Sequence, residues 1–152
     1  MSRFLVLLLI SLSTGCSREV LDPALSGTFE LESRDGAPLP APIPTVVDGH
    51  DCLNEMLSAA LTIESTGSWT ESMLARHRCT GPGAAIIGPV ASEYSGNFEV
   101  SGDAPMVLVF TSDELETEGN TQTAVIDGNE LHLTFTEGGS KRDHAFVYRR
   151  RK

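Results

Sequence analysis

The chain has 152 residues, which is enough for one domain and too short for two sizeable ones. It carries 21 Asp and Glu against 11 Lys and Arg, and its formal net charge of -10 argues against nucleic acid as a partner, because that binding depends on cationic contacts with phosphate. Hydrophobic residues make up 40% of the chain, which is too many for a disordered protein and enough for one core.

The first 15 residues have the pattern of an export signal. Arg3 gives a positively charged start, and Phe4–Leu12 is apolar apart from one serine. About nine apolar residues are too few for a transmembrane helix, which needs about 20, but they match the hydrophobic region of a signal peptide. The run Ser13-Thr14-Gly15-Cys16 resembles the lipobox of bacterial lipoproteins. This resemblance implies cleavage before Cys16 and a lipid with fatty acyl (palmitate) chains on its thiol; the alternative is an ordinary secretory signal.

The residues after the signal predict how the domain is held. Residues 16–25 would serve as lipid anchor and short tether, and nine extended residues reach at most about 30 Å. The folded domain therefore sits close to the membrane. Ser17, which is not Asp, resembles the default signal for sorting to the outer membrane. We expect a lipid-anchored protein of the cell envelope, at the outer membrane and facing the periplasm.

The first part of the domain predicts a strand, a loop and an ambiguous segment. Ser26–Ser33 alternates between apolar and polar residues, which predicts a half-buried strand with Phe29 and Leu31 facing inward. Arg34–Pro44 is rich in proline and predicts a loop. Cys52–Ala60 is ambiguous between a strand and a short helix, because several of its apolar residues fit one helical face.

Short strands separated by glycine and proline turns are predicted for the rest of the chain. Met106–Phe110 is continuously apolar, so we expect both of its faces to be covered. Asp127-Gly128-Asn129 separates two alternating runs and is a strong hairpin signal. The other expected strands and apolar segments are Thr45–Asp48, Leu61–Ser65, Ser68–Cys79, Ala84–Val90, Asn97–Ser101, Thr121–Ile126, Glu130–Thr136 and His144–Arg149.

This pattern predicts an all-β domain over residues 26–150. Sequential hairpins favour a small antiparallel up-and-down barrel of about eight strands, with a sandwich as the alternative. The aromatic side chains are expected to fill its core. They are Trp69, Phe98, Phe110, Phe135, Phe146 and Tyr148.

Four motifs of the domain resemble those of small lipocalin-like β-barrel lipoproteins of bacteria. The motifs are Gly27-Thr28-Phe29-Glu30-Leu31, Asp35-Gly36-Ala37-Pro38-Leu39-Pro40, Ser95-Gly96-Asn97-Phe98-Glu99-Val100-Ser101-Gly102 and Asp127-Gly128-Asn129-Glu130-Leu131-His132-Leu133. The resemblance implies a lipocalin-like barrel that binds a small apolar or amphipathic molecule. Phe29 stands where lipocalins carry the tryptophan of a Gly-x-Trp motif.

Two cysteines remain if Cys16 carries lipid. In an oxidising compartment a disulfide between Cys52 and Cys79 is the default, and it would contribute ~3 kcal/mol by closing a loop of about 27 residues. A zinc site is the alternative, because His50 and His77 each precede one of these cysteines by two residues and would share its face of a strand. Free thiols are the third possibility. We expect no metal or cofactor, and the two histidines are weak candidates for a surface metal.

The chain lacks the common catalytic motifs, such as Gly-x-Ser-x-Gly, Ser-x-x-Lys and His-Glu-x-x-His, so we expect no enzyme. The leading hypothesis is a non-catalytic binding module for a small apolar or amphipathic molecule. The alternative is a protein–protein module, such as an envelope hydrolase inhibitor or an assembly factor, whose acidic surface attracts a basic envelope protein. The cationic end Arg149–Lys152 is expected to be frayed and solvated, with contact to anionic lipid head groups as the alternative.

Overall fold

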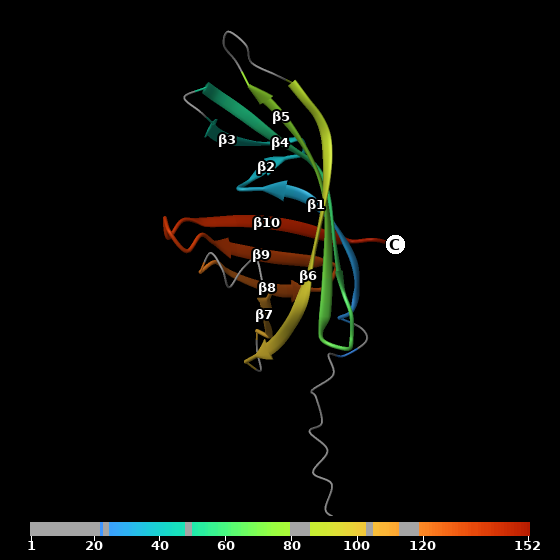
Figure 1. Ribbon diagram of the computed structural model, residues 1–152. Helices are drawn as coiled ribbons and strands as arrows, with labels where there is room; N and C mark the ends of the chain where they lie inside the picture. The colour runs from blue at the N-terminus through green and yellow to red at the C-terminus, as the bar shows by residue number, and fades with distance from the viewer. Residues whose placement is uncertain (1–21, 23–24, 48–49, 80–85, 103–104, 113–118) are drawn as a thin grey trace, which may run out of the picture.

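One antiparallel sheet that closes on itself forms the folded part of the chain (Figure 1). The computed structural model describes residues 22, 25–47, 50–79, 86–102, 105–112 and 119–152, and for residues 43–52 and 86–87 it describes the backbone alone. The expected signal peptide, Cys16 and most of the tether lie outside these residues. The strands are β1 Gly27–Arg34, β2 Ala37–Pro38, β3 Ala41–Val47, β4 His50–Ile63, β5 Ser68–Cys79, β6 Ile86–Ser101, β7 Val107–Thr111, β8 Thr121–Asp127, β9 Glu130–Thr136 and β10 Asp143–Arg150.

Eight strands form a closed ring in the order β1-β10-β9-β8-β7-β6-β5-β4. The ring closes because β1 pairs with β4, with Gly27 opposite Ile63 and Glu30 opposite Ala60. All pairs in the ring are antiparallel, and from β4 to β10 each strand lies beside the next one in sequence. The expected eight-stranded up-and-down barrel is therefore confirmed, and the sandwich is excluded. The described residues contain no helix long and apolar enough to cross a membrane.

The longest strands project beyond the ring at one end (Figure 1). There β3 pairs with the first half of β4, and β2 pairs with the end of β1. The loop expected over Arg34–Pro44 is thus wrong, since it contains β2 and the start of β3. Prolines are tolerated in β3 because it is the edge of the sheet. Pro42 and Pro44 lie two residues apart, so both of their missing N–H groups point to the same side of the strand.

The segment that was ambiguous between strand and helix is part of β4, so the helix is wrong. A β-bulge lies between Met56 and Ser58 and inserts one extra residue into the strand. The buried positions of β4 are therefore Met56, Ala59, Leu61 and Ile63. Their first spacing is three residues, as on a helix, and only the later spacings are two. The bulge thus interrupts the alternation by which a strand is identified in the sequence.

The end of the barrel opposite the projecting strands is packed solid. Phe29, Leu61 and Leu131 are fully buried there. Strand β7 alternates instead of being covered on both faces as expected, since Leu108 is 1% exposed and Val109 is 37% exposed. Val109 is β-branched, and β-branched residues are common in strands even on the exposed face.

The C-terminal arginines are held against the barrel, so the expectation of a frayed end is wrong for them. Arg149 forms ion pairs with Glu32 at 3.1 Å and with Glu130 at 3.2 Å. The guanidinium of Arg150 lies 4.6 Å from the centre of the Phe29 ring. These contacts hold the end of β10 to β1 and β9.

Gly96 has no side chain, and this allows the Thr111 backbone and the Trp69 side chain to lie close to it. A Cβ on Gly96 would lie 2.0 Å from the Thr111 carbonyl oxygen and 2.9 Å from Trp69 Nε1. We expect Gly96→Ala to reduce the free energy of unfolding by about 1–3 kcal/mol through overpacking. Gly88→Ala, on the same strand and with open space around it, should change it by less than about 0.5 kcal/mol. Urea unfolding followed by tryptophan fluorescence measures both; equal effects would contradict this account.

Candidate functional site

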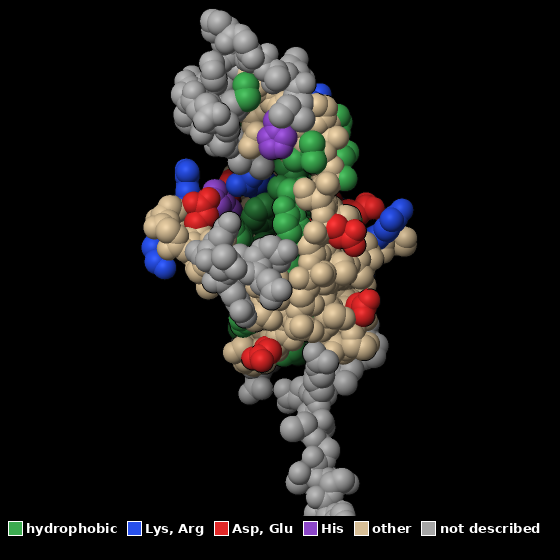
Figure 2. Space-filling view, viewed as in Figure 1, with side chains coloured by type: hydrophobic (Ala, Val, Ile, Leu, Met, Phe, Trp, Pro, Cys, Tyr) green, Lys and Arg blue, Asp and Glu red, His purple; other side chains and the backbone are tan. Residues whose placement is uncertain are grey.

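The barrel interior is hollow toward the projecting strands, where a cavity of about 410 Å³ lies. Arg34 ends β1, Ser112 follows β7 and Asn120 precedes β8, and all three line the cavity. These positions place it at one end of the ring, which we call the mouth. Figure 2 shows a recess with hydrophobic side chains beneath the projecting strands. Small-molecule sites usually have volumes of about 300–1,000 Å³, so the cavity is large enough for one small ligand.

Aromatic and thioether side chains make most of the wall. The indole of Trp69 lies on the side of the packed end, with its ring centre 5.4 Å from that of Phe110, and its Nε1 donates to the Asn97 carbonyl at 3.1 Å. Phe98 and Phe110 belong to the core, as expected. Trp69 and Tyr148 are also buried in the core and Phe135 and Phe146 pack against it, and these four residues line the cavity as well. The apolar and aromatic lining consists of Met56, Trp69, Met73, Tyr94, Leu133, Phe135, Phe146 and Tyr148.

A carboxylate and a phenol form a polar pair inside this wall. The Tyr148 hydroxyl donates a hydrogen bond to Glu71 Oε1. Burial raises the pKa of Glu71, and the hydrogen bond from Tyr148 opposes that shift. Burial and the charge of Glu71 raise the pKa of Tyr148 well above 10.0, so the phenol remains a donor at neutral pH. Tyr148 is the one hydrogen-bond donor to Glu71 among the described residues, and no cation there is paired with it.

Arg34 supplies a positive charge nearer the mouth. Its side chain is 11% exposed, and its guanidinium lies 5.4 Å from the centre of the Phe146 ring. Nε lies 3.6 Å from Asp35 Oδ2, which is too long for a hydrogen bond, and this buried nitrogen has no hydrogen-bond partner in the described structure. Burial lowers the pKa of Arg34 and the Asp35 charge raises it; the guanidinium stays protonated at neutral pH.

A cluster of hydrogen bonds braces the rim beside Arg34. His144 Nδ1 lies 3.0 Å from Asp35 Oδ2, and His144 Nε2 lies 3.2 Å from Glu137 Oε1. Asp35 Oδ1 also accepts the Ala145 N–H at 2.8 Å. Burial raises the pKa of Asp35, but the hydrogen bonds from His144 and Ala145 and the charges of His144 and Arg34 outweigh it and lower the pKa below 3.8. The cluster joins the β1–β2 turn to β10 and so holds the backbone next to Arg34 in place.

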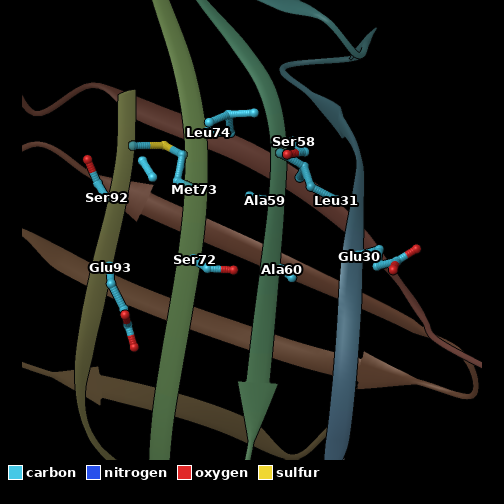
Figure 3. Close-up of a pocket in the computed structure, with 11 residues that line it drawn as sticks. Glu30, Leu31, Ser58, Ala59, Ala60, Ser72, Met73, Leu74, Ser92 and Glu93 are labelled. Atoms are coloured by element: carbon cyan, nitrogen blue, oxygen red, sulfur yellow. The ribbon is translucent and has the colours of Figure 1, made fainter. Parts of the chain in front are cut away.

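A second hollow, of about 630 Å³, is an open groove on the outer face of β1, β4, β5 and β6. Figure 3 shows Glu30 and Glu93 at its two sides, with Ala60 and Ser72 between them. Its floor consists mainly of small side chains, and Glu30, Ser72 and Glu93 are exposed to solvent. It lacks the aromatic walls of the cavity and the polar groups that converge inside it, so the cavity is the better candidate site.

The strand register brings the two remaining cysteines together. Cys52 lies directly opposite Cys79, and Asn54 lies opposite His77, whose Nδ1 is 2.5 Å from Asn54 Oδ1. Opposed residues of antiparallel strands have Cα atoms about 4.5–5.5 Å apart, which a disulfide can span. The side chains of His50 and Cys52 lie outside the described part. Among the side chains that are described, no three potential ligands gather as a metal site. The disulfide stays a prediction.

Sequence reasoning missed Glu71 and Arg34 as site residues. The signal for Glu71 was present, because it occupies the inward position between Trp69 and Met73 in an alternating strand. A charged residue at an inward position indicates a functional group or a buried pair. Arg34 had no such signal, since the register shift after Leu31 turns it inward.

Comparison with known proteins gives no match for this chain: no protein-family model, no curated protein and no solved structure matches it.

The buried carboxylate generates a prediction on stability. Because the pKa of Glu71 is raised above 4.5 by folding, the unfolded chain ionises first as the pH rises, and the folded state loses stability between pH 4.5 and the raised pKa. We expect Glu71→Gln, which has no charge to bury, to unfold at a higher temperature than the wild type at pH 7, by about 2–4 °C for each kcal/mol gained.

The advantage of Glu71→Gln should shrink as the pH falls from the raised pKa toward 4.5, because below 4.5 the wild-type carboxyl is protonated in both states. Glu93→Gln, on the exposed face of β6, is the matched control and should leave the melting temperature almost unchanged. A lower melting temperature for Glu71→Gln at pH 7 would show that the charged carboxylate is stabilised in the empty barrel. Circular dichroism melts at several pH values provide the measurement.

Proposed function

We propose that this protein is a lipid-anchored envelope lipoprotein whose lipocalin-like barrel binds a small apolar or amphipathic molecule without catalysis. The observation that carries the proposal is the cavity of about 410 Å³ inside the ring. An eight-stranded barrel can fill its interior with side chains, and this one fills only the end away from the mouth. Protein interiors are otherwise close-packed, so a hollow of this size inside the ring supports a role for an occupant.

The chemistry of the wall supports a ligand that is mostly apolar. Aromatic and thioether groups offer dispersion and ring contacts, while Glu71, Tyr148, Gln122 and Arg34 are the polar groups that can fix its orientation. The cavity holds no cluster of metal ligands in the described part of the chain. A binding module accounts for these features without a chemical step.

The proposed anchor gives the barrel an orientation. The tether would run from Cys16 to Gly27, and Gly27 lies opposite Ile63 at the packed end of the ring. The mouth is at the other end. A protein held to the periplasmic face of the outer membrane through residues 16–25 would therefore present its mouth away from the point of attachment, where it can exchange ligand with the periplasm.

A second candidate function is a protein–protein module, such as a hydrolase inhibitor or an assembly factor. The groove between Glu30 and Glu93 and the net charge of -10 favour a basic envelope protein as its partner. Such a partner would be retained at low salt and released at high salt. Its binding would not depend on residues inside the barrel.

Filling the cavity tests the proposed function. Met73 faces the interior, and its neighbour Leu74 faces outward by strand alternation. We expect the purified full chain to bind the neutral apolar dye N-phenyl-1-naphthylamine saturably, above a matched detergent blank. Met73→Trp should weaken binding by about tenfold or more, because its indole occupies the cavity, and Leu74→Trp should leave it unchanged. Equal behaviour of the two variants, or dye fluorescence no greater than that of the blank, would contradict the proposal.

Intact mass of the membrane-purified protein tests the anchor and the cysteine pairing together. We expect a mass that corresponds to residues 16–152 with acyl chains on Cys16. Alkylation of Cys52 and Cys79 should require a reductant, because a disulfide joins them. An unlipidated mass would contradict the anchor, and alkylation of both thiols without a reductant would contradict the disulfide.

A further inference from the structure

We propose that the molecule bound in the cavity is a small organic cation, with its ammonium group held by Glu71 and its apolar body against the aromatic wall. The inference rests on the proposed function and adds the chemical class of the ligand. It follows from four features of the cavity: a carboxylate without a cationic partner, a phenol that holds it, aromatic rings around it, and an arginine nearer the mouth.

The carboxylate of Glu71 has an unfilled place for a cation. The ion pairs of the described residues join other groups, such as Arg76 with Glu55 at 2.6 Å and Arg149 with Glu130 at 3.2 Å. Glu71 has one phenol as its partner there, although it lies inside the barrel. A buried charge is costly unless it is paired. A ligand cation supplies the missing charge and would also hold the carboxyl in its ionised form.

Tyr148 leaves one oxygen of Glu71 available. Its hydroxyl donates to Oε1, and no described residue donates to Oε2. The phenol comes from β10 and the carboxylate from β5, so the hydrogen bond fixes the carboxylate from across the barrel. An ammonium at Oε2 would form a charge-assisted hydrogen bond, which is stronger than one between neutral groups.

The surrounding rings suit the same ligand. Tyr94 lies directly opposite Glu71 in the strand register, and both line the cavity. Trp69 lies two residues from Glu71 along β5 and faces the same side. The faces of aromatic rings attract organic cations, and their apolar surface accommodates the rest of the molecule.

Arg34 favours one orientation of the bound cation, with the ammonium group away from the mouth. It lies opposite Phe146, two residues nearer the mouth than Tyr148, which is about 7 Å along the strand. The positive guanidinium disfavours an ammonium at its own level and favours one at Glu71. A carboxylate ligand would have the opposite preference, for Arg34.

Three phenyl-bearing probes of similar size separate these chemistries: 2-phenylethylamine, 2-phenylethanol and 3-phenylpropionate. Calorimetric titration of the full chain at pH 7 should give an affinity for the amine at least about tenfold above that of the alcohol and of the acid, because the amine alone pairs with Glu71. Glu71→Gln should bring the amine to within about twofold of the alcohol. Glu93→Gln, outside the barrel, should leave the preference intact.

The amine preference should also weaken at low pH. The amine stays protonated, so a loss of affinity as the pH falls through the raised pKa of Glu71 reports protonation of that carboxyl. The titratable and charged groups that line the cavity with Glu71 are Tyr148 from β10, Tyr94 from β6 and Arg34 from β1. The other strands around it contribute side chains that do not titrate: Met56, Gln122 and Leu133.

The outcomes distinguish this inference from the proposed function. If the alcohol or the acid binds as tightly as the amine, or if Glu71→Gln keeps the preference, the cation is excluded while the barrel remains a binding module. Tightest binding of the acid with loss in Arg34→Gln would assign the cavity to anions. If none of the three binds and the naphthylamine dye also fails, both proposals are wrong.

Discussion

The pairing of β1 with β4 is the constraint on which the rest of the structure depends. It joins residues 27–30 to residues 60–63 and turns a meander into a ring without a free edge along its closed part. The two strands part beyond this short contact, where β1 continues against β2 and β4 lies against β3. The interior therefore has one end that can be packed and one end that opens. The hollow lies where the strands diverge.

The division of the interior places a packed core beside the proposed binding site. The packed end carries fully buried side chains such as Phe29, Leu61 and Leu131, and the guanidinium of Arg150 lies over the Phe29 ring. The other end leaves space around the Glu71 carboxylate and the Arg34 guanidinium, both of which are costly to bury. Natural proteins often accept such local cost at functional sites, because the same groups would be compensated by a ligand.

The sequence predicted the architecture well, since period-two alternation directly shows which side of a strand faces the core. Ser68–Cys79 and Glu130–Thr136 were predicted with the bounds observed. It failed in β4, where a bulge at Leu57 interrupts the alternation and the segment was ambiguous between a strand and a helix. Proline in β3 indicated a loop because an edge position depends on which strands pair, and local composition does not show this.

The candidate site was less predictable than the fold. The inward position of Glu71 could be deduced from alternation within β5, but its phenol partner comes from β10, 77 residues away. The orientation of Arg34 depends on a register shift in β1 that only the paired strand defines. Whether the interior is filled or hollow depends on how all eight strands twist together, and no local pattern of side chains determines that.

A crystal structure of the full chain soaked with 2-phenylethylamine tests the central claim most directly. The account predicts density for the amine inside the ring, with its nitrogen about 2.7–3.2 Å from Glu71 Oε2 and its phenyl ring against the aromatic wall. Side chains that fill the interior, or density confined to the outer groove between Glu30 and Glu93, would contradict it.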